Sequence, residues 1–294
     1  MRSRVSVFVG IVLMAGLGCQ GQAPEADAGS VEEGLRVFIS VDMEGIAGVT
    51  AGSEVNSSGP HYPYFRKMTT LEANAAVEGA LAAGATEIVV RDGHGAKNNI
   101  IPDLLHKEAK LLRGVTDRPE NMMLGLDETF DAVIFIGYHA KAGTEGGILA
   151  HTSSGNVVDL SVNGVSLPEA GYNGIMAGNL GVPVVMLAGD NWICEQAKDL
   201  LGDVITVETK VGMGTAELGL HPEVVREKIR AATTSALVDL GRFQPYRMEP
   251  PYRMVLKVRR ERTPYPGAER TGEGEFTFTS TDFLEVMDAF NARK

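Results

Sequence analysis

Short, nearly uninterrupted apolar runs alternate with helical patterns along most of the chain. The runs are rich in aliphatic and β-branched residues, as expected for strands buried on both faces of a sheet. They cover residues 35–41, 86–91, 131–137 and 182–187. Apolar positions with helical spacing lie between them, at residues 63–84, 167–180 and 192–201. This alternation predicts an α/β fold in which a central, largely parallel sheet is flanked by helices.

The pattern changes in the last quarter of the chain. A helical stretch at 222–240 is followed by two strand-like segments, 253–259 and 275–280, and by a closing helix at 282–293. We therefore expect a smaller C-terminal α+β elaboration beside the main sheet. Residues 157–165 alternate between apolar and polar positions and contain Asn163-Gly164, which indicates a hairpin.

The N-terminal segment is typical of an export signal. Arg2 and Arg4 precede the uncharged, mostly apolar residues 5–18, a run too short to span a bilayer comfortably. We interpret residues 1–18 as a signal peptide of the lipoprotein type, with Cys19 as the lipidated residue. The alternative is an ordinary cleaved signal with an incidental cysteine. Either reading predicts an exported, periplasmic or extracytoplasmic protein, and the lipoprotein reading adds membrane contact through the lipid alone.

Residues 19–33 are rich in Gln, Ala, Pro and Gly and predict a flexible linker, which leaves residues 34–294 as the folded domain. The whole chain carries 27 basic and 38 acidic residues, a net charge of −11, and this balance argues against a nucleic-acid partner. With only two cysteines, Cys19 and Cys194, a four-thiolate zinc module is excluded. Any metal must therefore be bound by carboxylates and histidines.

Polar residues follow the predicted strands at the points where ligands gather in an open α/β sheet. They are Asp42 and Glu44, Asp92 and His94, His139, and Asp190. Asp42 and Glu44 are two residues apart on an extended segment and so project from the same face. Two carboxylates this close repel each other, and a divalent cation removes that penalty. The alternative is that one of them caps a turn.

Two further side chains, Glu169 and His151, extend this set, and most of these candidates also have an ordinary structural reading. Flanking glycines expose His94 to a ligand, although a loop histidine is often simply solvated. His139 ends a very apolar strand and could equally be a satisfied core residue. Glu169 stands in the first turn of a predicted helix, where acids are favoured by the helix dipole alone. His151 begins a polar stretch and has no evident structural duty.

Together these motifs resemble one family, the D-aminopeptidases of the type found in dipeptide-transport operons, which are zinc peptidases of family M55. The resemblance covers nearly everything from about Leu35 to the C-terminus. It rests on five separated segments in the same order: Ser40–Gly45, Asp92–His94, Gly137–Ala140, Glu169–Gly178 and Ala188–Asp190.

The resemblance implies a centre of two zinc ions per chain. Asp42 would bridge both ions, Glu44 and His94 would complete one, and His139 and Glu169 the other. His151 corresponds to the catalytic histidine of the family. Each zinc would then have three nitrogen or oxygen ligands and an open position for water or substrate.

The implied activity is zinc-dependent release of an N-terminal residue, with D-amino acids favoured, from a short peptide or an amino-acid amide. The family also implies a ring-like homo-oligomer, a decamer. Two alternatives remain open on the residues alone. One is another dinuclear metallohydrolase, such as a phosphoesterase, although no Gly-x-x-x-x-Gly-Lys-Ser/Thr loop is present. The other is a non-catalytic peptide-binding lipoprotein.

Overall fold

The computed structural model describes residues 34–261, 263 and 265–292. The predicted signal peptide (1–18), Cys19 and the linker (19–33) lie outside these residues. Among the helices of the described part, none is long and apolar enough to cross a membrane.

A seven-stranded sheet forms the centre of the fold, in the order β3-β2-β1-β4-β7-β8-β9. Every neighbouring pair is parallel except β8 and β9. The strands are β1 (Arg36–Val41), β2 (Glu87–Asp92), β3 (Lys110–Leu112), β4 (Ala132–Tyr138), β7 (Val184–Asp190), β8 (Ile205–Met213) and β9 (Ala216–Gly219). The largely parallel sheet predicted from the sequence is confirmed.

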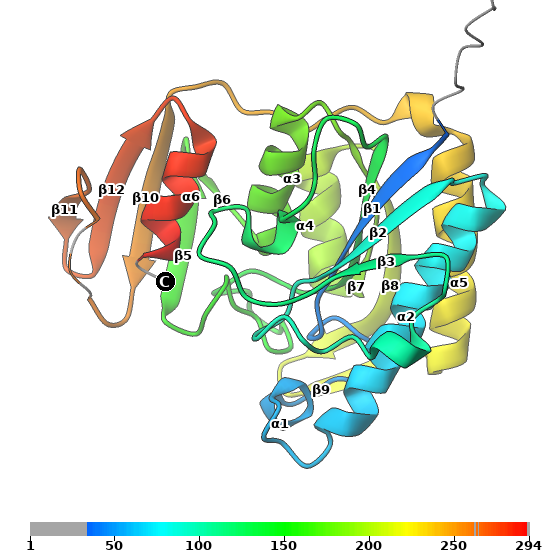
Figure 1. Ribbon diagram of the computed structural model, residues 1–294. Helices are drawn as coiled ribbons and strands as arrows, with labels where there is room; N and C mark the ends of the chain where they lie inside the picture. Colours follow the sequence, from blue (N-terminus) through cyan, green and yellow to red (C-terminus); the bar gives the residue numbers. More distant parts are fainter. Residues whose placement is uncertain (1–33, 262, 264, 293–294) are drawn as a thin grey trace, which may run out of the picture. The chain divides into compact units, whose positions relative to one another are not determined.

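Helices cover both faces of this sheet (Figure 1). One face packs against α2 (Tyr62–Ala82) and α5 (Pro222–Val238), and the other against α3 (Glu169–Asn179) and α4 (Asn191–Leu201). Successive side chains of a strand point to opposite faces, and in β1 Ile39 joins the α2–α5 core while Phe38 joins the other. Burial on both faces explains the continuous apolar runs in the sequence.

A second, five-stranded sheet has the order β11-β12-β10-β5-β6 and lies beside α6 (Phe283–Asn291) (Figure 1). Its C-terminal strands are the predicted elaboration. Its other strands come from the mid-chain hairpin, whose turn places Asn163 and Gly164 at φ 51° and 82°. The strands are β5 (Val157–Val162), β6 (Val165–Ser166), β10 (Tyr252–Val258), β11 (Glu269–Gly272) and β12 (Glu275–Ser280).

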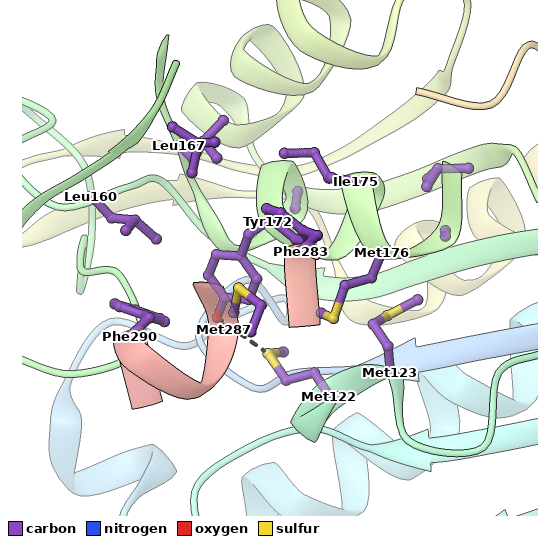
Figure 2. Packing of buried hydrophobic residues seen from close by; sticks show 14 of the residues in the cluster. Met122, Met123, Leu160, Leu167, Tyr172, Ile175, Met176, Phe283, Met287 and Phe290 are labelled. Carbon is purple, nitrogen blue, oxygen red and sulfur yellow. Dashed lines mark hydrogen bonds between the residues drawn. The ribbon is translucent and has the colours of Figure 1, made fainter. Parts of the chain in front are cut away.

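Helix α6 is joined to α3 by a buried cluster of aromatic and sulfur-containing side chains (Figure 2). The rings of Tyr172 and Phe290 lie 5.7 Å apart, and the Tyr172 hydroxyl contacts the sulfur of Met122. Met122 belongs to η2 (Asn121–Met123), a short 3-10 helix. Because α3 begins at Glu169, this packing fixes the helix that carries one of the predicted metal ligands.

Several elements were not predicted. They are the short α1 (Gly52–Val55), η1 (Pro102–Leu104), η2, η3 (Leu240–Arg242), β3, β9 and β11, and the nine-residue strand β8. Helix α3 also begins two residues later than expected. The reason is that the Leu167 N–H bonds to the Leu160 carbonyl across the β5–β6 hairpin, which holds Leu167 in extended backbone. Cys194 is buried, as expected for a helix residue facing the core.

Candidate metal centre

Three neighbouring parallel strands deliver the candidate ligands to one edge of the main sheet. Asp42 follows β1, His94 follows β2, and His139 follows β4, the strands that lie side by side in the order β2-β1-β4. Glu169 is the first residue of α3, and His151 lies in the loop between β4 and β5. The structure thus brings together residues that are far apart in the sequence.

The loop after β1 is fixed by backbone contacts with the end of β4. The N–H groups of Asp42 and Gly45 bond to the carbonyls of Ile136 and Gly137 at 2.8 Å each. Gly137 has φ 73°, and a Cβ atom there would collide with the Asp42 carbonyl. Only glycine allows so close an approach, which explains the glycine two residues before His139.

The Asp42 carboxylate lies between two histidines and presents one oxygen to each. Oδ1 is 3.1 Å from His94 Nδ1, and Oδ2 is 3.5 Å from His139 Nε2. Glu44 Oε2 is 3.0 Å from His94 Nδ1, and Glu169 Oε1 is 3.6 Å from His139 Nε2. The side chains form two half-sites that share Asp42.

Backbone carbonyls orient the three imidazoles. His94 Nε2 is 2.9 Å from the Val55 carbonyl, His139 Nδ1 is 3.0 Å from the Ala140 carbonyl, and His151 Nδ1 is 2.7 Å from the Leu149 carbonyl. A carbonyl can only accept, so each of these ring nitrogens carries the proton. The other nitrogen of each ring faces the carboxylates, and in a neutral imidazole it offers its lone pair to a cation, as in metal-binding histidines.

Two buried atoms of this cluster, Glu44 Oε2 and His139 Nε2, have no hydrogen-bond partner. Buried polar atoms are almost always paired, and a cation would satisfy both. Two ligands of a tetrahedral zinc, each at about 2.1 Å, lie about 3.4 Å apart. The separations of 3.0–3.6 Å between the paired ligand atoms match that value. The donor set of imidazole and carboxylate groups therefore fits zinc.

Without a cation, the charges of the cluster shift one another's pKa. Burial alone would raise the pKa of Asp42, but the neighbouring imidazoles of His139 and His94 hold it below its ordinary value. Burial would also raise the pKa of Glu169, but this pKa is lowered to about 2, chiefly by His139. Burial would lower the pKa of His94 and His139, yet the neighbouring carboxylates raise both well above the ordinary value. The centre therefore carries negative charge that attracts cations.

Comparison with known proteins identifies the family. The family model for the D-aminopeptidases of peptidase family M55 matches residues 35–292. The chain belongs to this family. It is 34% identical over 266 residues to a D-aminopeptidase of Bacillus subtilis (strain 168), with 87% of this chain and 95% of the relative covered. Membership confirms the predicted resemblance and the assignment as an aminopeptidase.

A solved structure agrees with this family assignment. The chain matches the zinc-dependent D-aminopeptidase DppA from Bacillus subtilis, described as a self-compartmentalizing protease, with a TM-score of 0.83 and 31% identity. The match covers 87% of this chain and 96% of that one. The comparisons therefore support a zinc-dependent peptide hydrolase and do not favour a phosphoesterase or a binding protein.

Two of the strand-end acids have structural roles in this D-aminopeptidase family member. Asp92 accepts hydrogen bonds from the backbone N–H groups of Asn99 and Ile100 and so shapes the loop that carries His94. Asp190 caps α4 through the Ile193 N–H and also binds the Ala140 N–H. Each of these carboxylates accepts two backbone hydrogen bonds and so organises its loops.

A buried lysine that sequence reasoning missed holds the Glu44 loop. Lys210, in β8, is 1% exposed, and its ammonium donates to the carbonyls of Glu44 (2.6 Å), Ile46 (3.0 Å) and Val49. The adjacent Thr209 hydroxyl donates to the Gly45 carbonyl at 2.7 Å. These bonds fix the backbone that positions Glu44. The alternation in β8 was a usable strand signal, but it gave no hint that the lysine is buried.

A cavity of about 820 Å³ opens beside the metal centre. Its wall includes Asp42, His94, His151 and Glu169, together with residues 115–118 and the C-terminal end of α6. His151 is 25% exposed at its side chain, whereas His139 is 1% exposed. Of these two histidines, His151 is therefore the one that a substrate in the cavity can reach.

Proposed function

We propose that the chain is an exported aminopeptidase that removes N-terminal D-amino acids from short peptides, using two zinc ions per chain. The observation that carries this proposal is the shared geometry of Asp42, with one carboxylate oxygen toward His94 and the other toward His139. A carboxylate placed between two half-sites is the arrangement expected of a bridging ligand. The family and the zinc-dependent structural relative support the same reading.

The proposed ligand sets follow the two half-sites. Asp42 would bridge, Glu44 and His94 would complete one zinc site, and His139 and Glu169 the other. Zinc, when bound, supplies Lewis-acid polarisation of the scissile carbonyl and activation of the attacking water. Three anionic carboxylates offset most of the charge of two divalent cations, which suits a site buried among apolar loops.

His151 is proposed as the general base and acid of the reaction. Its Nδ1 donates to the Leu149 carbonyl at 2.7 Å, which leaves Nε2 free to accept a proton. Nε2 would take one proton from the attacking water and return it to the leaving amine as the peptide bond breaks. One water is consumed, and the products are the free N-terminal amino acid and the shortened peptide.

A metal and substrate panel tests this proposal. Purified protein is analysed for metal and then assayed on D-Ala-D-Ala, D-alaninamide, their L-enantiomers and a generic phosphate ester. We expect about two zinc ions per chain and hydrolysis of the D-substrates in preference to the others. Absence of zinc, or faster cleavage of the phosphate ester than of every peptide, would overturn the proposal.

The N-terminal proposal is that the signal peptide is removed before Cys19 and that this residue is lipidated. The order of charged, apolar and small residues in the sequence supports it. Wild-type protein is expected to incorporate labelled palmitate and to fractionate with membranes. The Cys19→Ser variant is expected to lose the label. An unlabelled, unprocessed wild type would contradict export by this route.

The assembly proposal is a ring-like homodecamer. Its support is the description of the structural relative as a self-compartmentalizing protease, which requires several copies to enclose a space. Light scattering after size-exclusion chromatography measures the mass directly. A species of about ten chains supports the decamer, and a monomer at all concentrations contradicts it.

A further inference from the structure

Lys97 is a buried cation in the loop that carries His94. Its side chain lines the cavity beside the metal centre, and the residue is 9% exposed. The ammonium donates to the Gly93 carbonyl, which is its one acceptor among residues 34–261, 263 and 265–292. An ammonium group has three N–H donors, so most of its hydrogen-bonding capacity is unused.

An ammonium group buried with unused donors is unfavourable unless a ligand completes its contacts. The backbone of Lys97 is also unusual, with φ 57°, a left-handed conformation that non-glycine residues adopt rarely. Such conformations persist where the surrounding structure imposes them, and they cluster at ligand sites. The loop thus holds a charged side chain at the cavity wall without pairing it.

The position of Lys97 relative to the centre favours a ligand that reaches both. Lys97 lines the same cavity as Asp42 and Glu169, and its backbone N–H donates to the His94 carbonyl at 2.8 Å. The other cation in the cavity wall, Arg118, is paired with Glu120 and its side chain is 64% exposed. Lys97 is therefore the buried cation available to an anionic substrate group.

We propose that Lys97 is a specificity-determining residue that binds a carboxylate of the substrate peptide. The proposal rests on the proposed peptidase function. A peptide whose N-terminal end is held at the metal centre would place a carboxylate further along its chain against the ammonium. A cavity of about 820 Å³ accommodates a short peptide. The carboxylate is either the C-terminus of a di- or tripeptide or an acidic side chain.

Three matched peptides distinguish the sources: D-Ala-D-Ala, D-Ala-D-Ala-amide and D-Ala-D-Glu-amide. In zinc-loaded enzyme, Lys97→Met is expected to raise KM at least about 10-fold for a carboxylate-bearing peptide and less than about 2-fold for the neutral amide. A rise in KM for D-Ala-D-Ala alone shows that Lys97 binds the C-terminal carboxylate. A rise for D-Ala-D-Glu-amide alone shows that it binds the acidic side chain. An equal rise in KM for all three peptides, or no rise for any of them, would overturn the proposal.

Three controls keep the result interpretable. Lys97→Arg retains the charge and is expected to recover most of the selectivity, whereas Arg118→Gln should leave it unchanged. Zinc content of each variant is measured, since Lys97 is not among the ligands. Calorimetry with the reduced-bond analogue of D-Ala-D-Ala and its amide measures binding without turnover. If the wild-type chain cleaves no peptide but Lys97→Met still weakens binding of the carboxylate-bearing analogue, the peptidase proposal is contradicted. The assignment of Lys97 as a carboxylate-binding residue is then retained.

Discussion

The imidazole rings of His139 and His151 stack on each other, with centroids 4.2 Å apart and planes inclined by 14°. Both rings direct Nε2 toward the same oxygen, Glu169 Oε1, at 3.6 and 3.8 Å. One ring is fully buried and the other borders the cavity. The pair thus joins an imidazole of the proposed metal centre to one that borders the cavity.

This stacking leads to a prediction for His151→Ala. Loss of a general acid–base side chain is expected to lower kcat/KM by about 100- to 10,000-fold, while zinc content stays near that of the wild type. Metal analysis and steady-state kinetics measure the two quantities. His61→Ala, at an exposed loop position, is the matched control. Loss of zinc would make His151 a ligand, and full activity with full zinc would show that the catalytic assignment is wrong.

The shared carboxylate predicts a graded loss of metal. Asp42→Ala removes a ligand from both half-sites, so we expect almost no bound zinc and activity lowered at least about 100-fold. Glu44→Gln removes a ligand from one half-site and is expected to retain about one zinc per chain. Asp288→Asn, which lies in the same cavity wall outside the cluster, should keep both ions. Equal zinc content in all three variants would contradict the bridging geometry.

The lysine beneath the Glu44 loop predicts a loss of both stability and metal affinity. Lys210→Met removes the ammonium that donates to the carbonyls of Glu44, Ile46 and Val49, and it is expected to cost at least about 3 kcal/mol of unfolding free energy. Thr209→Val removes one hydroxyl donor and should cost about 1–2 kcal/mol.

Urea denaturation and zinc titration measure these effects. The milder Thr209→Val variant keeps the test informative if Lys210→Met does not fold. It is expected to weaken zinc binding by about 10-fold, in the range found for groups that orient metal ligands. Lys198→Met, at an exposed position on α4, should change neither quantity. Unchanged zinc affinity in Thr209→Val would show that the loop does not need this support.

Zinc and protons compete for the same imidazole nitrogens. In the metal-free protein, burial lowers the pKa of His94 and His139, but the carboxylates around them raise both well above 6.5. Protonation therefore stabilises the metal-free fold at acid pH, and this contribution is lost as pH rises through the raised pKa. Zinc-loaded protein lacks these protons, so stabilisation by zinc should increase from about pH 6 to about pH 9.

Melting temperatures with and without zinc across this range provide the measurement. The expected result is a difference that widens steadily with pH. Exposed His221 offers an internal comparison, because replacing it with alanine should leave the pH profile of the zinc effect unchanged. A zinc-induced shift that is constant or shrinks toward alkaline pH would show that the histidines do not bind the metal as neutral imidazoles.

The sequence predicted best the strands whose residues are buried on both faces of the sheet. Strands β1, β4 and β7 are covered on both faces, so their apolar runs stand out, and the polar residues that follow them were easily found. Among the described residues, the short edge strands β3 and β9 have no buried positions, so no apolar run marks them. This holds even for β9, which pairs with β8 across a two-residue turn.

The sequence revealed the site residues that lie at strand ends but not those that are buried by tertiary packing. Asp42, His94 and His139 were found because parallel strands end at the same edge. Lys97 and Lys210 were missed because lysine is ordinarily solvated, and only the folded chain shows which carbonyls surround it. Only the structure could distinguish the structural role of Asp92 from the proposed metal-binding role of Asp42. The distinction depends on which backbone N–H groups each carboxylate contacts.

The mixed origin of the second sheet has a consequence for biosynthesis. Strand β5 is made before most of α3, α4 and α5, yet its partner β10 is among the last segments to leave the ribosome. The α6 helix that packs on α3 is made later still. A nascent chain can therefore form much of the parallel sheet while the support behind Glu169 is missing. Hydrolytic competence is expected only after synthesis is complete, so premature termination products would be inactive.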